Sequence, residues 1–190
     1  MRRLISKQKQ QRQDRVKQII VGSVLIVIMF ASVLGYAFQG QGNEENSDIE
    51  YNGFEFVKQN NFWILDDEFM FKYNPLETED FYFKEYVNLL SDFQNNPLYI
   101  YSENKEAELE VYKNLYNSVQ RIQYACLNNS FNLNCESSWP TKTCENNFIL
   151  IQEGEFNVWQ ENNCIFIKGP KENLTKISDE VLFKIIGIKT

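Results

Sequence analysis

The chain contains no histidine among its 190 residues. This absence excludes imidazole acid–base catalysis, triads with a histidine base, histidine-ligated metal sites and histidine pH switches. The glycine-rich phosphate loops and dinucleotide fingerprints of nucleotide-binding enzymes are missing as well. The sequence therefore predicts no cofactor, no metal site and no nucleic-acid partner.

Charge is missing from one internal segment, residues 19–39, and is unevenly divided between the two segments that flank it. Residues 1–18 carry seven cations and one acid, whereas residues 40–190 carry 12 cations and 25 acids. The net charge of −7 therefore combines a tail at +6 with a C-terminal part at −13. This segregation predicts three physically different parts in one chain.

The uncharged run from Ile19 to Phe38 is long enough to cross a bilayer, because 20 helical residues cover the roughly 30 Å hydrocarbon core. A helix also satisfies its backbone hydrogen bonds internally. By the positive-inside rule, the basic flank predicts a cytoplasmic N-terminus. We expect a single-pass cell-membrane protein with a basic cytoplasmic tail (1–18), a transmembrane helix (19–39), a linker (40–47) and an extracytoplasmic domain (48–190).

A cleaved secretory signal is the alternative interpretation of the same segment. Gly35 and Ala37 are spaced like the small residues that precede a cleavage site. The apolar run is longer than the roughly 7–15 residues usual for a signal peptide, which favours an uncleaved signal-anchor. Both interpretations export the residues that follow.

Two features of the N-terminal part predict its contacts. Ala31 and Gly35 form a small-xxx-small pair, the spacing that lets two membrane helices pack closely. The cations of the tail favour anionic lipid headgroups over nucleic acid, because they flank a membrane span. The lipid bilayer is therefore the first expected partner.

All four cysteines, Cys126, Cys135, Cys144 and Cys164, lie in the part that is expected to be exported. An even number of cysteines in an oxidising compartment predicts disulfides, and four cysteines allow three connectivities. A zinc site is the alternative, but their spacings contain no C-x2-C knuckle. We favour Cys126–Cys135, which closes a loop after a long helix, and Cys144–Cys164, which ties the start of a hairpin system to its last strand.

Two Asn-x-Ser/Thr sequons begin at Asn128 and Asn173. They are candidate glycosylation sites in a host that glycosylates exported proteins. The sequence does not distinguish them from sequons that arise by chance in an asparagine-rich chain.

The C-terminal part combines short alternating apolar runs with segments of helical periodicity. The expected fold class is α+β, in the order βββ-α-β-α-βββ-α. The expected elements, in chain order, are a three-stranded meander over 51–71, a helix over 78–93, a strand over 98–101, a helix from Ser102 to Cys126, a cysteine-containing loop over 128–143, strands over 148–152, 156–160 and 164–168, and a helix over 171–186.

Several short segments resemble those of an uncharacterised family of small archaeal single-pass membrane proteins with an exported cysteine-containing domain. The segments are Asn52–Phe54, Pro75, Pro140–Cys144, Asn163–Gly169 and Ser178–Ile188. The resemblance implies an exported, anchored α+β domain, and it supplies no activity and no catalytic residue.

Acidic residues gather in two places. The run Asp66–Glu68 has oxygen ligands suitable for calcium, but it lacks the spacing of a calcium loop and lies where a hairpin turn is expected. Glu103, Glu106 and Glu110 share a helix face, and acids near a helix start are favoured by the macrodipole. Carboxylate catalysis requires one of them, for example Glu106, to meet a second acid such as Asp67.

Two other patterns are candidates for a catalytic or binding site. Ser102 and Lys105 have the spacing of a serine–lysine acylase motif, but the partner motifs are missing. Trp63, Trp139 and Trp159 can line a groove or fill a core, and Trp139 is the best surface candidate. We favour a core role for the tryptophans.

These observations favour a membrane-anchored extracytoplasmic interaction or accessory domain, with no evident catalytic site and with another envelope protein as its partner. The alternative is a carboxylate-dependent hydrolase that acts on cell-surface glycans or peptides. A sensor or assembly factor that signals through the basic tail is not distinguished from the first hypothesis by sequence.

Overall fold

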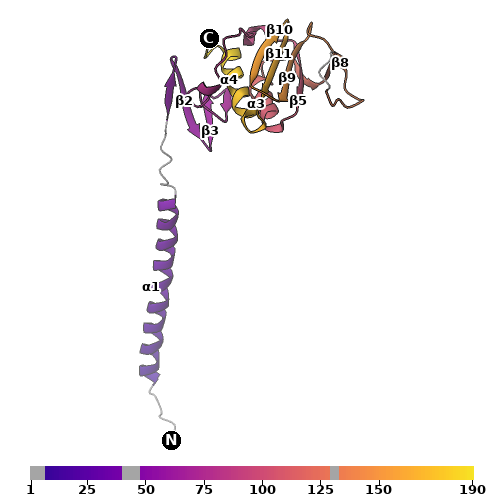
Figure 1. Cartoon of the computed structure of the whole chain (residues 1–190). Coiled ribbons are helices and arrows are strands. Elements are labelled where there is room, and N and C mark those ends of the chain that lie inside the picture. The colour runs from indigo at the N-terminus through magenta and orange to yellow at the C-terminus, as the bar shows by residue number, and fades with distance from the viewer. Residues whose placement is uncertain (1–6, 40–47, 129–132) are drawn as a thin grey trace. The chain divides into compact units, whose positions relative to one another are not determined.

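The computed structural model describes residues 7–39, 48–128 and 133–190 (Figure 1). The chain divides into two compact units, Met1–Asn46 and Ser47–Thr190.

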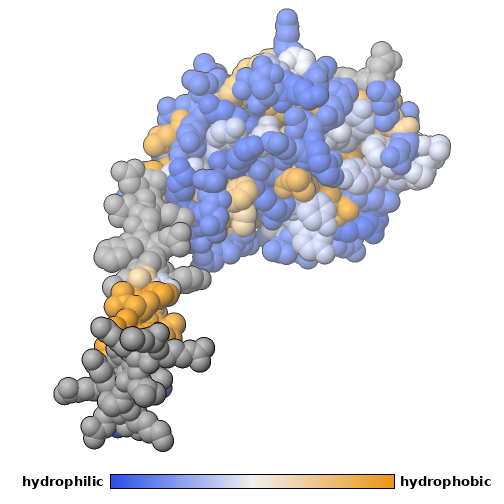
Figure 2. Space-filling view, turned by 90° about the horizontal axis from the view of Figure 1, so that it is seen from below, coloured by the Kyte–Doolittle hydropathy of each residue, from blue (hydrophilic) through white to orange (hydrophobic). Residues whose placement is uncertain are grey.

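The first unit contains the helix α1 (Lys7–Gln39). Its segment Arg15–Ser32 is long and apolar enough to cross a membrane, and none of it is buried by protein. Figure 2 shows the apolar side chains of this segment as an orange band. The helix starts within the expected tail, so residue 18 does not mark a break in it. The expected linker, 40–47, lies outside the described residues.

The second unit begins with an antiparallel meander of four strands, one more than the sequence predicts. Both residues of its first two turns, Asn52–Gly53 and Asn60–Asn61, have positive φ, as do Asp66 and Asp67 in the third turn. Tight hairpins require this left-handed backbone, which Gly, Asn and Asp tolerate best. The four strands are β1 (Ile49–Tyr51), β2 (Phe54–Gln59), β3 (Phe62–Leu65) and β4 (Phe69–Phe71).

A second, five-stranded sheet has the order β10-β11-β9-β5-β6. Its strands β11, β9, β5 and β6 are parallel neighbours, and β10 is an antiparallel edge. The central strands are almost continuously buried, as is usual for parallel strands that are covered on both faces. The strands are β5 (Pro97–Ser102), β6 (Arg121–Tyr124), β9 (Asn147–Glu153), β10 (Asn157–Glu161) and β11 (Cys164–Gly169).

Two helices cover one face of this sheet, α3 (Lys105–Leu115) and α4 (Leu174–Ile186). Figure 1 shows both of them between the meander and the five-stranded sheet. Eleven of the 13 residues of α4 are buried, which is typical of an internal helix. Phe183 of α4 packs on Phe71 of the meander with ring centroids 4.6 Å apart, and Gly169 of β11 allows a close approach of α4 on the other side.

The cysteine-containing segment covers the other face of the five-stranded sheet. A second apolar cluster there includes Tyr101, Phe148 and Phe166 of the sheet, with Trp139 and Trp159 packed against it. The segment itself forms a short parallel pair, β7 (Cys126–Leu127) and β8 (Thr141–Lys142).

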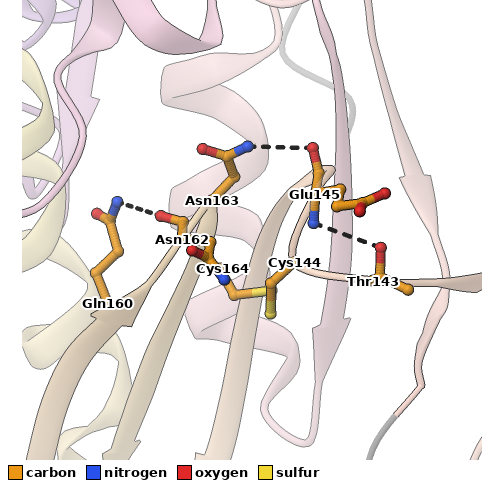
Figure 3. Close-up of a disulfide and its surroundings, with 7 residues drawn as sticks. All are labelled: Thr143, Cys144, Glu145, Gln160, Asn162, Asn163 and Cys164. Atoms are coloured by element: carbon orange, nitrogen blue, oxygen red, sulfur yellow. Dashed lines mark hydrogen bonds between the residues drawn. A yellow bond between two sulfur atoms is a disulfide. The ribbon is translucent and has the colours of Figure 1, made fainter.

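The cysteines pair as the sequence analysis favours. The sulfurs of Cys126 and Cys135 lie 1.97 Å apart, and those of Cys144 and Cys164 lie 2.16 Å apart, at bonding distance (Figure 3). The second bond joins the chain just before β9 to the first residue of β11.

The sequence predicts a helix over 78–93, and this prediction is wrong. The segment holds a 3-10 turn (η1, Glu79–Phe81) and one helical turn (α2, Leu90–Phe93), joined by irregular backbone. Its backbone groups bind side chains from elsewhere: Lys184 donates to the carbonyl of Phe83 at 2.6 Å, and the amide of Asn88 donates to Gln160 at 2.7 Å. These long-range hydrogen bonds replace those of a helix.

The helix expected from Ser102 to Cys126 is too long. It starts after Asn104, whose side chain accepts from the amide of Ala107 at 3.0 Å, and it ends at Leu115. Of the apolar residues that follow, Ile122 enters β6, which pairs with β5 in parallel and forms a β-α-β unit. The α+β class stands, although parallel pairing was not expected.

Candidate functional site

The two acids proposed for carboxylate catalysis, Glu106 and Asp67, line different hollows. Glu106 forms an ion pair with Lys72 at 2.7 Å. Asp67 belongs to the β3–β4 turn, where its positive φ gives it a structural role. Glu103 lies before α3 and accepts from the amide of Glu153 at 3.0 Å. The structure therefore does not bring Asp67 into the hollow that Glu106 lines.

Ser102 and Lys105 also have separate partners. The Ser102 hydroxyl donates to the carbonyl of Asn104 at 2.7 Å. Lys105 donates to Glu108 and to the hydroxyl of Tyr124. The hydrogen bond to the Glu108 carboxylate raises the pKa of Lys105, which keeps the amine protonated and unsuited to act as a base.

The three tryptophans are structural. Trp63 is buried, and its Nε1 donates to Glu77 at 3.1 Å. Trp159 stacks on Phe166 with centroids 4.6 Å apart. Trp139, the best surface candidate by sequence, is partly buried and packs on aromatic residues of the second cluster. The core interpretation is confirmed.

An apolar surface that the sequence analysis missed runs along the outer side of α3. Leu109, Tyr112 and Tyr116, called the α3 stripe below, are 50%, 43% and 53% exposed. Their spacing of three and four residues places them on one helix face, and the two tyrosine rings stack at 5.2 Å. The signal is present in the spacing, but the same helix also has a buried apolar face, and the sequence does not show which face is exposed.

The α3 stripe borders a cleft of about 420 Å³ between α3 and the meander. Phe62 of β3 and Leu109 and Tyr112 of α3 line it. Lys113 lies over the ring of Phe62, 4.6 Å from its centroid, and the Lys72–Glu106 ion pair stands at the rim. The cleft therefore combines an apolar lining with paired charges at its edge.

A buried pair of acids lies behind the cleft, where α3 packs on α4. Asp179 is fully buried and accepts from the amide of Tyr73 at 2.9 Å. Glu110 is 4% exposed and is held by Lys113 at 2.7 Å. Burial raises the pKa of Asp179 well above its usual range, and the charge of Glu110 raises it further. The raised pKa favours the protonated form of Asp179 beside the paired carboxylate of Glu110, and no part of Asp179 reaches solvent.

Replacing Asp179 by Asn is expected to remove a pH dependence from the free energy of unfolding. The raised pKa means that the folded protein keeps a proton that the unfolded chain loses above the ordinary pKa of 3.8. The contribution of this group is therefore fully present below that pH and is lost as the pH rises through the raised pKa of the folded state. Denaturant titrations between about pH 4 and pH 7 measure the slope.

The Asp179→Asn variant keeps an oxygen for the Tyr73 amide, so its fold should be retained. Asp80→Asn is the matched control, because Asp80 is exposed and lies 3.8 Å from Lys176. If the free energy of unfolding depends on pH equally in the wild type and in the Asp179→Asn variant, the pKa of Asp179 is not raised in the folded protein.

The two sequon asparagines and the small-xxx-small pair differ in their exposure to solvent. Asn128 is exposed, but its sequon continues into residues outside the described part of the chain. Asn173 is half-buried and its sequon threonine, Thr175, is buried at the start of α4. Ala31 is exposed on α1. The structure does not describe the surroundings of Gly35. Glycosylation and helix packing stay predictions.

Among the described residues, no three His, Cys, Asp or Glu side chains gather to hold a metal ion. No family model, curated protein or solved structure matches the chain.

Proposed function

We propose that this chain is a membrane-anchored accessory domain that binds another envelope protein through the α3 stripe. The apolar segment of α1 and the basic residues on its N-terminal side support a membrane anchor with a cytoplasmic N-terminus. The paired cysteines support a C-terminal domain in an oxidising compartment outside the cytoplasm. In this orientation the basic tail contacts anionic lipid headgroups of the cytoplasmic leaflet.

The observation that carries the proposal is the second apolar face of α3. The first face packs on the core through Ala107, Val111 and Leu115. The second leaves one leucine and two tyrosines exposed beside an open cleft. Contiguous apolar patches of this kind mark interaction sites, and tyrosine is enriched at the energetic centres of interfaces.

A protein suits this surface better than a lipid headgroup layer does. The residues from 40 onward carry a net charge of −13, which opposes contact with anionic lipid. Most of the surface in Figure 2 is hydrophilic, with only small apolar areas. The charge favours a partner that presents an apolar segment flanked by cations.

Replacing Leu109 by Asp in the full-length chain is expected to reduce recovery of the partner at least tenfold. A carboxylate in the middle of an apolar contact loses about 2 kcal/mol or more of binding free energy. The measurement is photo-crosslinking in cells from a reactive residue at position 116, followed by mass spectrometry of the crosslinked protein.

Leu76→Asp provides the matched control, because Leu76 is 51% exposed and lies outside the cleft. This variant should keep the wild-type crosslink. The proposal fails if position 116 yields no reproducible crosslink, or if the two leucine variants behave alike.

A further inference from the structure

A second cavity, of about 400 Å³, has a mainly polar lining, unlike the apolar α3 cleft. It is lined where the parallel strands begin, by Pro97 of β5, Asn147 of β9 and Asn163 just before β11. The buried side chain of Tyr99 forms part of its wall. The Cys144–Cys164 disulfide is adjacent and fixes two of the lining segments to each other (Figure 3).

Three of the asparagines that line this cavity are oriented by hydrogen bonds to backbone carbonyls. Asn163 donates its Nδ2 to the carbonyl of Glu145 at 3.1 Å, as Figure 3 shows. Asn147 donates to the carbonyl of Asp92 at 3.2 Å, and Asn96 donates to that of Gln94 at 3.3 Å. These bonds fix the three amide groups, and no described residue donates to their amide oxygens.

The lining is therefore rich in acceptors. Asp92 and Glu145 add carboxylates, and only one oxygen of Asp92 is used, to accept from the amide of Leu89 at 2.9 Å. No lysine or arginine is among the lining residues. A ligand with several hydrogen-bond donors, which can also accept from the remaining amide N–H groups, suits this lining.

We propose that this cavity binds a sugar unit. Sugar hydroxyls donate to amide and carboxylate oxygens, and the volume falls within the usual range of small-molecule sites, about 300–1,000 Å³. A bare divalent cation suits the site less well, because the cavity is far larger than an ion and contributes only two carboxylates. The proposal is independent of protein binding at the α3 stripe.

The test uses the full chain in lipid nanodiscs, prepared without sugar-headed detergents, because these detergents would occupy the same cavity. The probes are glucose, galactose, mannose and N-acetylglucosamine, followed by ligand-observed NMR, with calcium chloride titrated separately. The expected result is saturable binding of at least one of these sugars and unchanged binding after EDTA is added.

Two variants locate the sugar. Asn147→Leu removes one amide oxygen and fills part of the cavity, and it should weaken binding at least tenfold. Asn146→Leu is the second variant; Asn146 lines the cavity but makes no side-chain hydrogen bond with any described residue, so its loss should not disturb folding. The control is Asn117→Leu on an exposed turn, which should bind as the wild type does.

Three outcomes overturn the proposal. The first is that none of the four sugars binds saturably. The second is that a sugar binds equally to the wild type and to both cavity variants. The third is that calcium binds in an EDTA-sensitive manner, is lost in a Glu145→Gln variant, and no sugar binds.

Discussion

Replacing Lys189 by Met is expected to lower the free energy of unfolding of the C-terminal domain by about 3–5 kcal/mol. Glu180 is fully buried, and its Oε2 lies 2.5 Å from the Lys189 amine. The amine also donates to the carbonyl of Pro75 at 2.7 Å and to the hydroxyl of Thr78 at 3.1 Å. Methionine fills a similar volume but leaves a buried carboxylate without its counter-charge. Urea denaturation monitored by tryptophan fluorescence measures the loss.

The size of this effect depends on burial, so an exposed ion pair supplies the control. Lys171 lies 3.2 Å from Glu153, with its side chain 71% exposed. The Lys171→Met change should cost no more than about 1 kcal/mol. The double variant Lys189→Met with Glu180→Leu should recover much of the lost stability, because it removes both charges. Equal costs for the two lysine variants would show that Lys189 does not hold a buried charge.

This buried group also explains why part of the fold was not predictable. Thr78 and Lys189 are separated by 111 positions in the chain. The lysine amine, together with the Thr78 hydroxyl, satisfies the carbonyl of Pro75 and pins the segment that follows the meander. Periodicity in that segment predicts a helix because it registers spacing alone. It contains no information about distant side chains, such as Lys184, whose amine binds the carbonyl of Phe83 within that segment.

The features that could be predicted have local causes. The final helix shows its apolar periodicity and ends at Gly187, whose φ of 85° is a left-handed cap. The strands β9, β10 and β11 are separated by recognisable turns. Both of these inferences needed only neighbouring residues and a general rule. The favoured cysteine pairing is also confirmed, although the helix that it assumed to end at Cys126 ends at Leu115.

The parallel sheet and both candidate sites required tertiary information. β6 has four residues and only one of them is partly buried, so its sequence lacks the pattern of a strand. The α3 stripe and the buried face of the same helix are both apolar, and sequence alone does not say which one meets the core. The polar cavity depends on three separate strand starts, which become neighbours only when β5, β9 and β11 pair.

The Cys144–Cys164 disulfide should contribute about 3 kcal/mol to stability, so replacing both cysteines by Ala should lower the free energy of unfolding by at least that amount. The cysteines are 20 positions apart, and the bond restricts the unfolded chain in proportion to the logarithm of that separation. Cys164 is also fully buried in the second apolar cluster, so losing its sulfur adds a small packing cost. A reducing agent opens both disulfides of the wild type, so the reduced protein should lose more stability than the variant that lacks Cys144–Cys164 alone.

The Cys126–Cys135 bond provides the comparison, because its separation of nine positions predicts a smaller contribution of about 2.5 kcal/mol. The two bonds also differ in what they hold. Cys144–Cys164 ties a segment to the central sheet, whereas Cys126–Cys135 closes a loop within the segment that covers it. Removing the first should therefore increase hydrogen exchange in β9 and β11, and removing the second should affect only the covering segment. If the variant without Cys144–Cys164 keeps wild-type stability and exchange, the aromatic packing of the second cluster is sufficient to hold this face of the sheet closed.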